Sequence, residues 1–402
     1  MLNRRSFLKA TPALAAGGAL AAAETPAHAN ALAREVGQVK IKEVNAYAVN
    51  RAVFAQVIAD DGTEGWGECG HSGGWFVAAL VNRELSDLAE GADVFDAEPL
   101  WHKLFFEIDE LGPGGIASQA LAGVDCALWD LRGKLLGVPV WALLGGKFRS
   151  EISLYGSFSR SLGGNQRRTP ASSAEHAAEL VEEGFQSIKV RLAIREENQD
   201  PADDPALPTM RAVRDAVGDD IELFVDANNG YTAFRAIEIG KQLRDEVGIT
   251  AFEEPVAAYQ YPALAQVADA LDLPVTAGEH EYTRWQFRDL ILNGRVDVLN
   301  PDVSKLAGLT EAKKVAALAE VFDRPMAVHN ARPTLLTAAH LHFVASSLNA
   351  HRRQEHPRAT RLDHLWDYFE NRTDVSNGIA TVSDLPGLGL VPRVAAIKRD
   401  AK

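Results

Sequence analysis

The sequence predicts an α/β protein whose larger part is a (β/α)8 barrel of the TIM type, preceded by a smaller α+β region. Two observations predict this architecture. From about residue 152 onward, short apolar strands alternate with helical stretches of roughly ten to twenty residues, which is typical of a parallel barrel. Before that point, strand patterns come first and helical patterns follow, with no strand–helix rhythm. With 402 residues the chain is long enough for both parts.

The first 29 residues are predicted to be an export signal and not part of the fold. Asn3–Lys9 (NRRSFLK) resembles a twin-arginine signal, a weakly apolar run follows, and Ala27–Ala29 (AHA) offers a cleavage site. The alternative is a chance Arg-Arg pair with no role in export. We expect a twin-arginine signal peptide over residues 1–29 and a periplasmic mature protein. No other stretch is long and apolar enough to span a bilayer, so we expect no membrane contact after cleavage.

Residues 30–150 are predicted to form an α+β capping domain. Alternating patterns between Lys40 and Ala59 predict two strands, and a third short strand is expected around Trp66–Glu68. Helical patterns follow as far as Leu144. In the last of them, over residues 120–131, apolar residues recur at three- and four-residue spacing, so we expect a helix with one buried face.

Residues 151–360 are predicted to form the barrel, and its eight strands are read from short apolar runs between helical patterns. These strands are expected at Ile152–Phe158, Gln186–Leu192, Ile221–Asn228, Thr250–Pro255, Pro274–Glu279, Val296–Val303, Pro325–His329 and Arg353–Glu355. A Pro/Gly-rich stretch at residues 384–389 follows. We expect residues 361–402 to return to the capping domain and complete it.

Charge and cysteine content narrow the class of protein. The formal net charge is 41 − 55 = −14, which argues against nucleic acid or an anionic membrane surface as the main partner. It does not exclude an anionic small molecule, because a bound dication inverts the local field. The two cysteines, Cys69 and Cys126, are expected to be buried free thiols, with a disulfide as the alternative.

Three acidic residues stand at the ends of consecutive predicted strands. They are Asp226, Glu253 and Glu279, with separations of 253 − 226 = 27 and 279 − 253 = 26 residues. The carboxyl ends of neighbouring barrel strands share one mouth, so these carboxylates should converge. Three converging carboxylates stay ionised only beside a cation, and all-oxygen ligation favours Mg²⁺ over Zn²⁺. A single strand-end acid is more often a helix cap or a salt-bridge partner, but three in register weaken that reading.

These motifs resemble those of the mandelate racemase-like branch of the enolase superfamily. Asp226-x-Asn228, Glu253-Glu254-Pro255 and Gly278-Glu279 match that family's three metal-ligand strands in order and spacing. The resemblance covers nearly all of the expected mature chain, including Gly65–Glu68 and Pro386–Gly389. It implies a capping domain that closes over the barrel mouth, a structural role for Glu254 rather than ligation, and a homo-oligomer.

A candidate acid–base pair lies on the next two predicted strands. Asp302 and His329 are 329 − 302 = 27 residues apart, and a carboxylate behind an imidazole fixes its tautomer and raises its basicity. A lone histidine often only fills a core, but here it is in register with the three acids. By resemblance, the family's catalytic dyad falls on these two residues. Relatives of the muconate cycloisomerase type carry a lysine at the position of Asp302.

The second predicted barrel strand places Lys189 and Arg191 toward the barrel interior. The resembling family usually has Lys-x-Lys here, with the second lysine as a base. Arg191 is a poor base because a guanidinium stays protonated at neutral pH, yet it can hold a carboxylate or a leaving hydroxyl. Lys189 is expected to be either a base or a cation beside the substrate carboxylate. The alternative is a salt bridge with the metal carboxylates.

Four further residues are candidate substrate contacts. Glu355 matches the position at which the resembling family places an acid that bonds the substrate carboxylate, with a surface charge as the alternative. Asn228 lies on the same side of its strand as Asp226. His280 begins a short run similar to that of rhamnonate dehydratase-like enzymes, and His71, in the loop of residues 70–76, is either a specificity contact or loop filler.

Taken with the resemblance, these residues predict a Mg²⁺-dependent lyase that dehydrates an aldonic or aldaric acid to a 2-keto-3-deoxy acid. The proton α to the carboxylate would be removed through a metal-stabilised ene-diolate. Replacement of the second lysine by Arg191 favours this reaction over racemisation of a 2-hydroxy acid, which needs a base on each face of the α-carbon. An exported protein that binds sugar acids without turnover is the alternative from another class.

Overall fold

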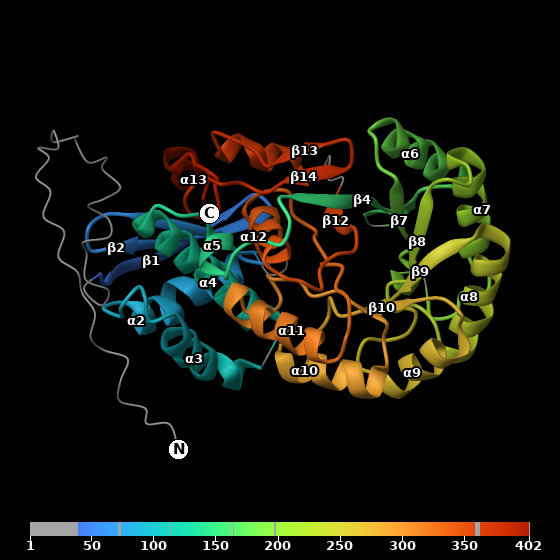
Figure 1. The fold of residues 1–402 in the computed structure, drawn as a ribbon, viewed down its shortest axis with the longest axis horizontal. Helices are drawn as coiled ribbons and strands as arrows, with labels where there is room; N and C mark the ends of the chain where they lie inside the picture. The colour runs from blue at the N-terminus through green and yellow to red at the C-terminus, as the bar shows by residue number, and fades with distance from the viewer. Residues whose placement is uncertain are drawn as a thin grey trace, which may run out of the picture.

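The computed structural model describes residues 39–401 except for a few positions in loops, which are 71–73, 113, 164, 197 and 358–361. The expected signal peptide over residues 1–29 and the candidate contact His71 lie outside the described residues. Figure 1 shows two lobes side by side, with the N-terminal elements on one side and a ring of strands and helices on the other. This confirms the predicted fold class of a capping domain and a (β/α)8 barrel.

The cap is a three-stranded antiparallel sheet covered by helices. Its strands β1 (Ile41–Val49), β2 (Ala52–Ala59) and β3 (Glu64–Glu68) follow one another in the sheet. Helix α4 (Gly115–Leu136) packs closely on β3, because a Cβ at Gly67 would lie 2.2 Å from the backbone oxygen of Gly123. The remaining helices of the cap are α1 (Gly74–Leu80), α2 (Ser86–Ala89), α3 (Ala97–Ile108) and α5 (Val140–Leu143).

The barrel is formed by parallel strands that begin at Glu151. They are β4 (Glu151–Ser159), β7 (Ser187–Arg191), β8 (Glu222–Asp226), β9 (Ile249–Glu253), β10 (Val275–Ala277), β11 (Val298–Leu299) and β12 (Gln354–Pro357). Each pairs with the next in this order as far as β11, and β12 pairs in parallel with β4 to close the ring. The strands are shorter than expected at β10 and β11.

The expected seventh strand, Pro325–His329, is replaced by an extended segment with one isolated bridge, between Leu299 and Met326. Its backbone groups are bonded partly by side chains. The N–H of Val328 donates to Gln354 Oε1 at 2.7 Å, and the N–H of Asn330 donates to Glu355 Oε2 at 3.0 Å. The segment therefore keeps its place in the ring without a regular ladder to β12.

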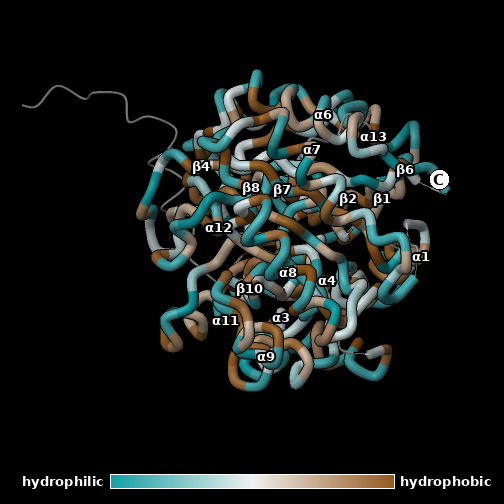
Figure 2. The backbone as a smooth tube through the Cα atoms, turned by 90° about the vertical axis from the view of Figure 1, so that its right-hand side faces the viewer, coloured by the Kyte–Doolittle hydropathy of each residue, from teal (hydrophilic) through white to brown (hydrophobic). Residues whose placement is uncertain are grey.

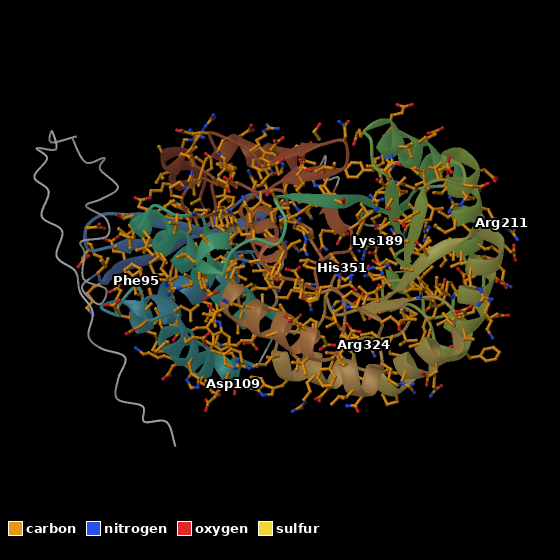
Figure 3. All side chains as sticks on the ribbon, viewed as in Figure 1. Phe95, Asp109, Lys189, Arg211, Arg324 and His351 are labelled. Carbon is orange, nitrogen blue, oxygen red and sulfur yellow. The ribbon has the colours of Figure 1, made fainter. Side chains whose placement is uncertain are left out.

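Helices surround the strands and enclose an apolar core. They are α6 (Pro170–Glu182), α7 (Ala206–Val217), α8 (Ala233–Val247), α9 (Tyr261–Ala270), α10 (Arg284–Asp289), α11 (Leu309–Val321) and α12 (Leu335–Ala345). Figure 2 shows hydrophobic segments near β7 and β8, and hydrophilic and hydrophobic stretches alternate along the surrounding helices and loops. Figure 3 places Lys189 inside the ring and Arg211 at its outer edge, on α7.

The C-terminal segment packs on both lobes. Strand β14 (Ile379–Thr381) pairs with β13 (Asp374–Ser376) and with the start of β4, and neither strand was predicted. Farther on, the chain reaches the cap. The N–H of Val140 donates to the backbone oxygen of Gly387 at 2.9 Å, and the N–H of Leu388 donates to Asp130 Oδ1 at 2.7 Å. Helix α13 (Val394–Asp400) ends the segment beside the cap sheet (Figure 1).

The structure also bears on the cysteines and on membrane-spanning helices. Cys69 and Cys126 are buried free thiols, as predicted. Within the described part of the chain, no helix has both the length and the apolar character needed to cross a bilayer.

His342 on α12 joins cap, barrel and tail, and its neutral form is the one that fits. Its Nδ1 accepts a hydrogen bond from the N–H of Trp141 at 3.1 Å, and burial lowers the pKa of His342 from 6.5 to about 4. A lowered pKa means that the unfolded chain takes up the proton first. Stability from this residue is therefore complete above pH 6.5 and is lost as the pH falls through about 4.

We expect acidification from pH 7 to pH 4 to cost the wild type about 3 kcal/mol more unfolding free energy than it costs His342→Gln. Urea unfolding at each pH measures this difference. His364→Gln, which removes an exposed histidine from the tail, serves as the control and should behave as the wild type. Equal losses in the wild type and His342→Gln would show that His342 does not link the lobes in this way.

Candidate active site

A cavity of about 490 Å³ opens where the barrel strands end, and the cap contributes to its wall. Among the described residues, most of the predicted site residues line it. These are Lys189, Arg191, Asp226, Asn228, Glu279, His280, His329 and Glu355. A second cavity of about 310 Å³ lies elsewhere in the barrel and is lined by Glu253 but not by His329. The first cavity is therefore the candidate active site.

The predicted metal carboxylates are buried beneath this cavity. Asp226 and Glu253 are the last residues of β8 and β9, and Glu279 follows β10. Glu253 Oε1 accepts from Lys189 Nζ at 2.7 Å, whereas Glu279 Oε2 lies 2.7 Å from His329 Nε2. Burial and the nearby carboxylates raise the pKa of Glu253 to about 8, against the opposing effect of Lys189, and burial also raises the pKa of Asp226.

The tightest grouping of possible ligand atoms differs from the predicted trio. It consists of Glu254, Glu279 and His280, whose ligand atoms lie within 4.8 Å of one another. The backbone of Glu254 has φ 42°, in the left-handed region, so the chain turns sharply directly after β9. Glu254 Oε2 also accepts a hydrogen bond from Asn229 Nδ2 at 2.7 Å. Glu279 is thus common to both sets, while Glu254 competes with Glu253 for the role of ligand.

The charge balance of the site fits a bound dication. Among the described residues, five buried carboxylates share the region with two buried lysines, and these seven residues are Asp226, Glu253, Glu254, Glu279, Glu355, Lys189 and Lys305. Burial, followed by the charges of Glu279 and Asp226, raises the pKa of Glu254 well above its usual value. An all-oxygen set such as Asp226, Glu253 and Glu279 suits Mg²⁺, whereas a set containing His280 suits softer ions.

The predicted acid–base pair is in contact. His329 Nδ1 lies 2.7 Å from Asp302 Oδ2, and Asp302 is fully buried. Burial alone would lower the pKa of His329, but the charges of Glu279 and Glu355 and the Asp302 hydrogen bond raise it well above its usual value. With Asp302 holding Nδ1, the Nε2 of His329 points toward Glu279 and the cavity. His329 is therefore oriented to exchange a proton through Nε2.

Lys189 and Arg191 stand on the β7 side of the cavity, and both are bound to other groups. Lys189 Nζ lies 2.7 Å from Glu253 Oε1 and 3.0 Å from Glu355 Oε1. Although burial opposes it, the charges of these two carboxylates raise the pKa of Lys189 well above its usual value. Arg191 contacts Asn228 Oδ1 and, at 3.1 Å, Glu196 Oε1. The contacts of Lys189 are therefore those expected for a salt bridge with the predicted metal carboxylates. Lys189 and Arg191 are both positively charged in this site.

Glu355 lies in β12 and His280 follows β10, and both line the cavity. Despite burial, Lys189 and His329 lower the pKa of Glu355, which faces the cavity with both partners beside it. His280 Nε2 lies 3.4 Å from Glu279 Oε1, and burial lowers the pKa of His280 to about 4. The two residues therefore enter the site as a carboxylate and a neutral imidazole.

Several described residues that line the cavity were missed by sequence reasoning, among them Arg195. Lys305 is buried with Nζ 3.3 Å from Glu279 Oε1, and its position three residues after Asp302, one turn further on, was a signal for it. Gln119 on α4 and Tyr282, after β10, also line the cavity. For Gln119 the sequence held no signal, because its place depends on how the cap docks on the barrel.

Comparison with known proteins defines the class of this chain. Residues 38–145 match the mandelate racemase/muconate lactonizing enzyme N-terminal domain, and residues 172–396 match the enolase C-terminal domain-like family. The chain therefore belongs to the enolase superfamily and is of the mandelate racemase/muconate lactonizing type. The resemblance seen in the metal-strand motifs is confirmed at the level of the family.

Among curated relatives, three similar proteins carry names of sugar-acid enzymes. A D-galactarolactone cycloisomerase from Agrobacterium fabrum is 33% identical over 87% of this chain and 89% of its own. An arabinonate dehydratase from Saccharolobus solfataricus is 31% identical over 85% of this chain and 88% of its own. A D-galactonate dehydratase from Ralstonia pickettii is 33% identical over 88% of this chain and 92% of its own.

One similar solved structure contains magnesium. The mandelate racemase/muconate lactonizing protein of Paracoccus denitrificans, complexed with magnesium, superposes with a TM-score of 0.84. It is 34% identical and covers 91% of this chain and 99% of its own. A relative with this fold thus binds magnesium.

Proposed function

We propose that this protein is a Mg²⁺-dependent dehydratase of an acid sugar, an aldonate or aldarate, and forms a 2-keto-3-deoxy acid. Curated relatives named as arabinonate and D-galactonate dehydratases support the reaction class, and the buried carboxylates at the barrel mouth support the metal. When bound, the dication neutralises the clustered carboxylates and the charge that develops on the substrate carboxylate.

One observation carries the choice of dehydration. Among the described cavity-lining residues, His329 is placed as the base because Asp302 holds its Nδ1 and a bound dication would take up the charge of Glu279, which lies 2.7 Å from Nε2 and raises the pKa of His329. The two candidates on the β7 side and Lys305 are cations bound by carboxylates or an amide oxygen. Lys189 is bound by two carboxylates, and Arg191 is a guanidinium held by Asn228 and Glu196. Racemisation requires a base on each face of the α-carbon, whereas elimination of water requires a base and an acid that can be the same histidine.

The proposed steps use this chain's own groups. His329 Nε2 takes the proton from the carbon next to the substrate carboxylate, and the electron pair forms a double bond to the β-carbon. The C–O bond at the β-carbon breaks, and the hydroxyl leaves as water with the proton that His329 returns. The enol then rearranges to the 2-keto-3-deoxy acid. Asp302 holds the imidazole in place throughout, at 2.7 Å from Nδ1.

A second candidate is cycloisomerisation of a sugar-acid lactone. It is favoured by the relative named D-galactarolactone cycloisomerase, which is as similar to this chain as the galactonate dehydratase. The same proton abstraction next to a carbonyl group serves both reactions, and the leaving oxygen would then belong to a lactone ring. His329 would keep its role in either case.

We expect the Mg²⁺-loaded protein to form 2-keto acid from at least one member of a library of aldonic and aldaric acids. The library should also contain their lactones, so that cycloisomerisation is detected separately. Exchange of the α-proton with D₂O, without loss of water, would favour racemisation instead. A protein that binds these acids with neither turnover nor exchange would be a binding protein, and the enzyme proposal would be wrong.

A further inference from the structure

The deepest cations of the cavity are neutralised by the carboxylates beneath it. Lys189 is 2% exposed and contacts both Glu253 and Glu355. Lys305 is 5% exposed, with Nζ 3.3 Å from Glu279 Oε1. These ammonium groups lie in the deep part of the cavity, called the floor here, beside the candidate metal ligands. His329 also contacts Glu279 there. The reacting carboxylate of a substrate must therefore lie at this floor.

Arg191, next along the wall, is also engaged. Its guanidinium contacts Asn228 Oδ1, Ser159 Oγ at 3.1 Å and Glu196 Oε1 at 3.1 Å. With three acceptors already bound, the donors of Arg191 that remain for a ligand are few.

Arg195 differs from these cations. It lies in the short 3₁₀ turn Ile194–Glu196 after β7, lines the cavity and is exposed. Among the described residues, the side chain of Arg195 takes part in neither a hydrogen bond nor an ion pair. Arg195 is thus a cation with free donors at the rim.

The backbone that carries Arg195 is held in place. Ala193 has φ 56°, and the N–H of Leu192 donates to the backbone oxygen of Asp226 at 2.8 Å. The turn packs directly on Gly230, where a Cβ would lie 2.4 Å from Ile194 Cβ and 2.9 Å from the backbone nitrogen of Arg195. Gly230 therefore allows a close approach that fixes the turn beside the metal strands.

The distance between the floor of the cavity and the cation at its rim favours one class of sugar acid over another. A substrate whose first carboxylate lies at the floor extends toward the mouth, so its far end meets rim residues such as Arg195. An aldonate ends in a neutral alcohol, whereas an aldarate ends in a second carboxylate. A guanidinium binds a carboxylate through two parallel hydrogen bonds, which are stronger than a bond to a neutral hydroxyl.

We infer that the substrate is a diacid, an aldarate or a sugar acid with a second carboxylate at its far end, and that Arg195 binds this second carboxylate. The inference rests on the proposed function for the position of the first carboxylate. It makes Arg195 a specificity-determining residue, with no part in moving protons.

The test compares acid pairs that differ only in the oxidation of carbon 6, namely galactarate with galactonate and glucarate with gluconate. For the pair that reacts, we expect the Mg²⁺-loaded wild type to have the higher kcat/KM for the aldarate. In Arg195→Gln the aldarate-to-aldonate ratio of kcat/KM should fall about 10- to 100-fold, mainly through the KM of the aldarate. Arg195→Lys, which keeps the charge but loses the fork, should give an intermediate ratio.

Arg83→Gln removes an exposed arginine from the cap outside the cavity and should leave the ratio unchanged. A wild type that prefers the aldonate, or a ratio unaltered in Arg195→Gln, would overturn the inference. If no acid forms keto acid, the proposed function fails by itself, and calorimetric titration with the same acid pairs then decides. Tighter binding of the aldarate that is lost in Arg195→Gln supports the inference, and equal or absent binding rejects it.

Discussion

His329→Asn is expected to lower kcat for keto-acid formation by about 10² to 10⁴-fold, the usual contribution of a positioned general base. The reason is that Nε2 of His329 faces the cavity while Asp302, 2.7 Å from Nδ1, holds the ring. Asparagine keeps a polar side chain of similar reach but cannot accept the proton. Steady-state assays on the acid found in the library screen measure the loss, and thermal unfolding shows whether the variant is folded.

Exchange of the α-proton separates this role from a later step. If His329 removes that proton, His329→Asn should lose both keto-acid formation and exchange of the substrate α-proton with D₂O. The control is His102→Gln, which replaces an exposed histidine on α3. Exchange that continues at the wild-type rate in a folded His329→Asn protein would assign the proton abstraction to another group.

Glu279→Gln is expected to abolish measurable Mg²⁺ binding, because Glu279 belongs both to the predicted ligand trio and to the tightest grouping in the structure. For the wild type, Mg²⁺ at 100 times its Kd should raise the free energy of unfolding by about 2.7 kcal/mol. In Glu279→Gln this gain should disappear, and keto-acid formation should fall with it. Removal of metal with a chelator should likewise stop the wild-type reaction, and added Mg²⁺ should restore it.

Two isosteric variants then decide between the alternative ligand sets. Resemblance to the family favours Glu253 as the ligand, so Glu253→Gln should weaken Mg²⁺ binding far more than Glu254→Gln does. Glu254 instead holds Asn229 at 2.7 Å and lies near His280. Isothermal titration with Mg²⁺ compares the two directly. Stronger loss in Glu254→Gln would assign the metal to the grouping of Glu254, Glu279 and His280.

Much of the barrel could be predicted because its strands are buried on both faces and interrupted by regular helices. The expected strand starting at Ile152 appears as β4, and the one ending near Asn228 appears as β8. The seventh strand was predicted but is irregular. The N–H groups of Val328 and Asn330 are bonded by the side chains of Gln354 and Glu355, about 25 residues away, and no local pattern encodes that partnership.

The candidate site could be predicted where its reactive side chains stand at the ends of predicted strands. Asp302 and His329 were paired from their spacing, and the structure brings them within 2.7 Å. Lys189 could be placed in the barrel, but its choice between base and cation depended on Glu253 and Glu355, which come from two other strands. The electrostatic energy of such an ion pair depends on the distance between the charges and on their burial. Neither quantity can be predicted from the spacing of residues along the chain.

The sequence by itself determined the fold class and the identity of the acidic and basic groups at the barrel mouth, because period-two strands and repeated strand–helix units place strand ends together. The family followed from the resemblance of the metal-strand motifs. The expectation of export also comes from sequence alone, on residues 1–29. Only the tertiary structure decided which charges neutralise one another. It ties Lys189, Lys305 and Arg191 to acceptors and leaves Arg195 without such a partner among the described residues, since ion pairing requires contacts between strands and loops far apart in the chain.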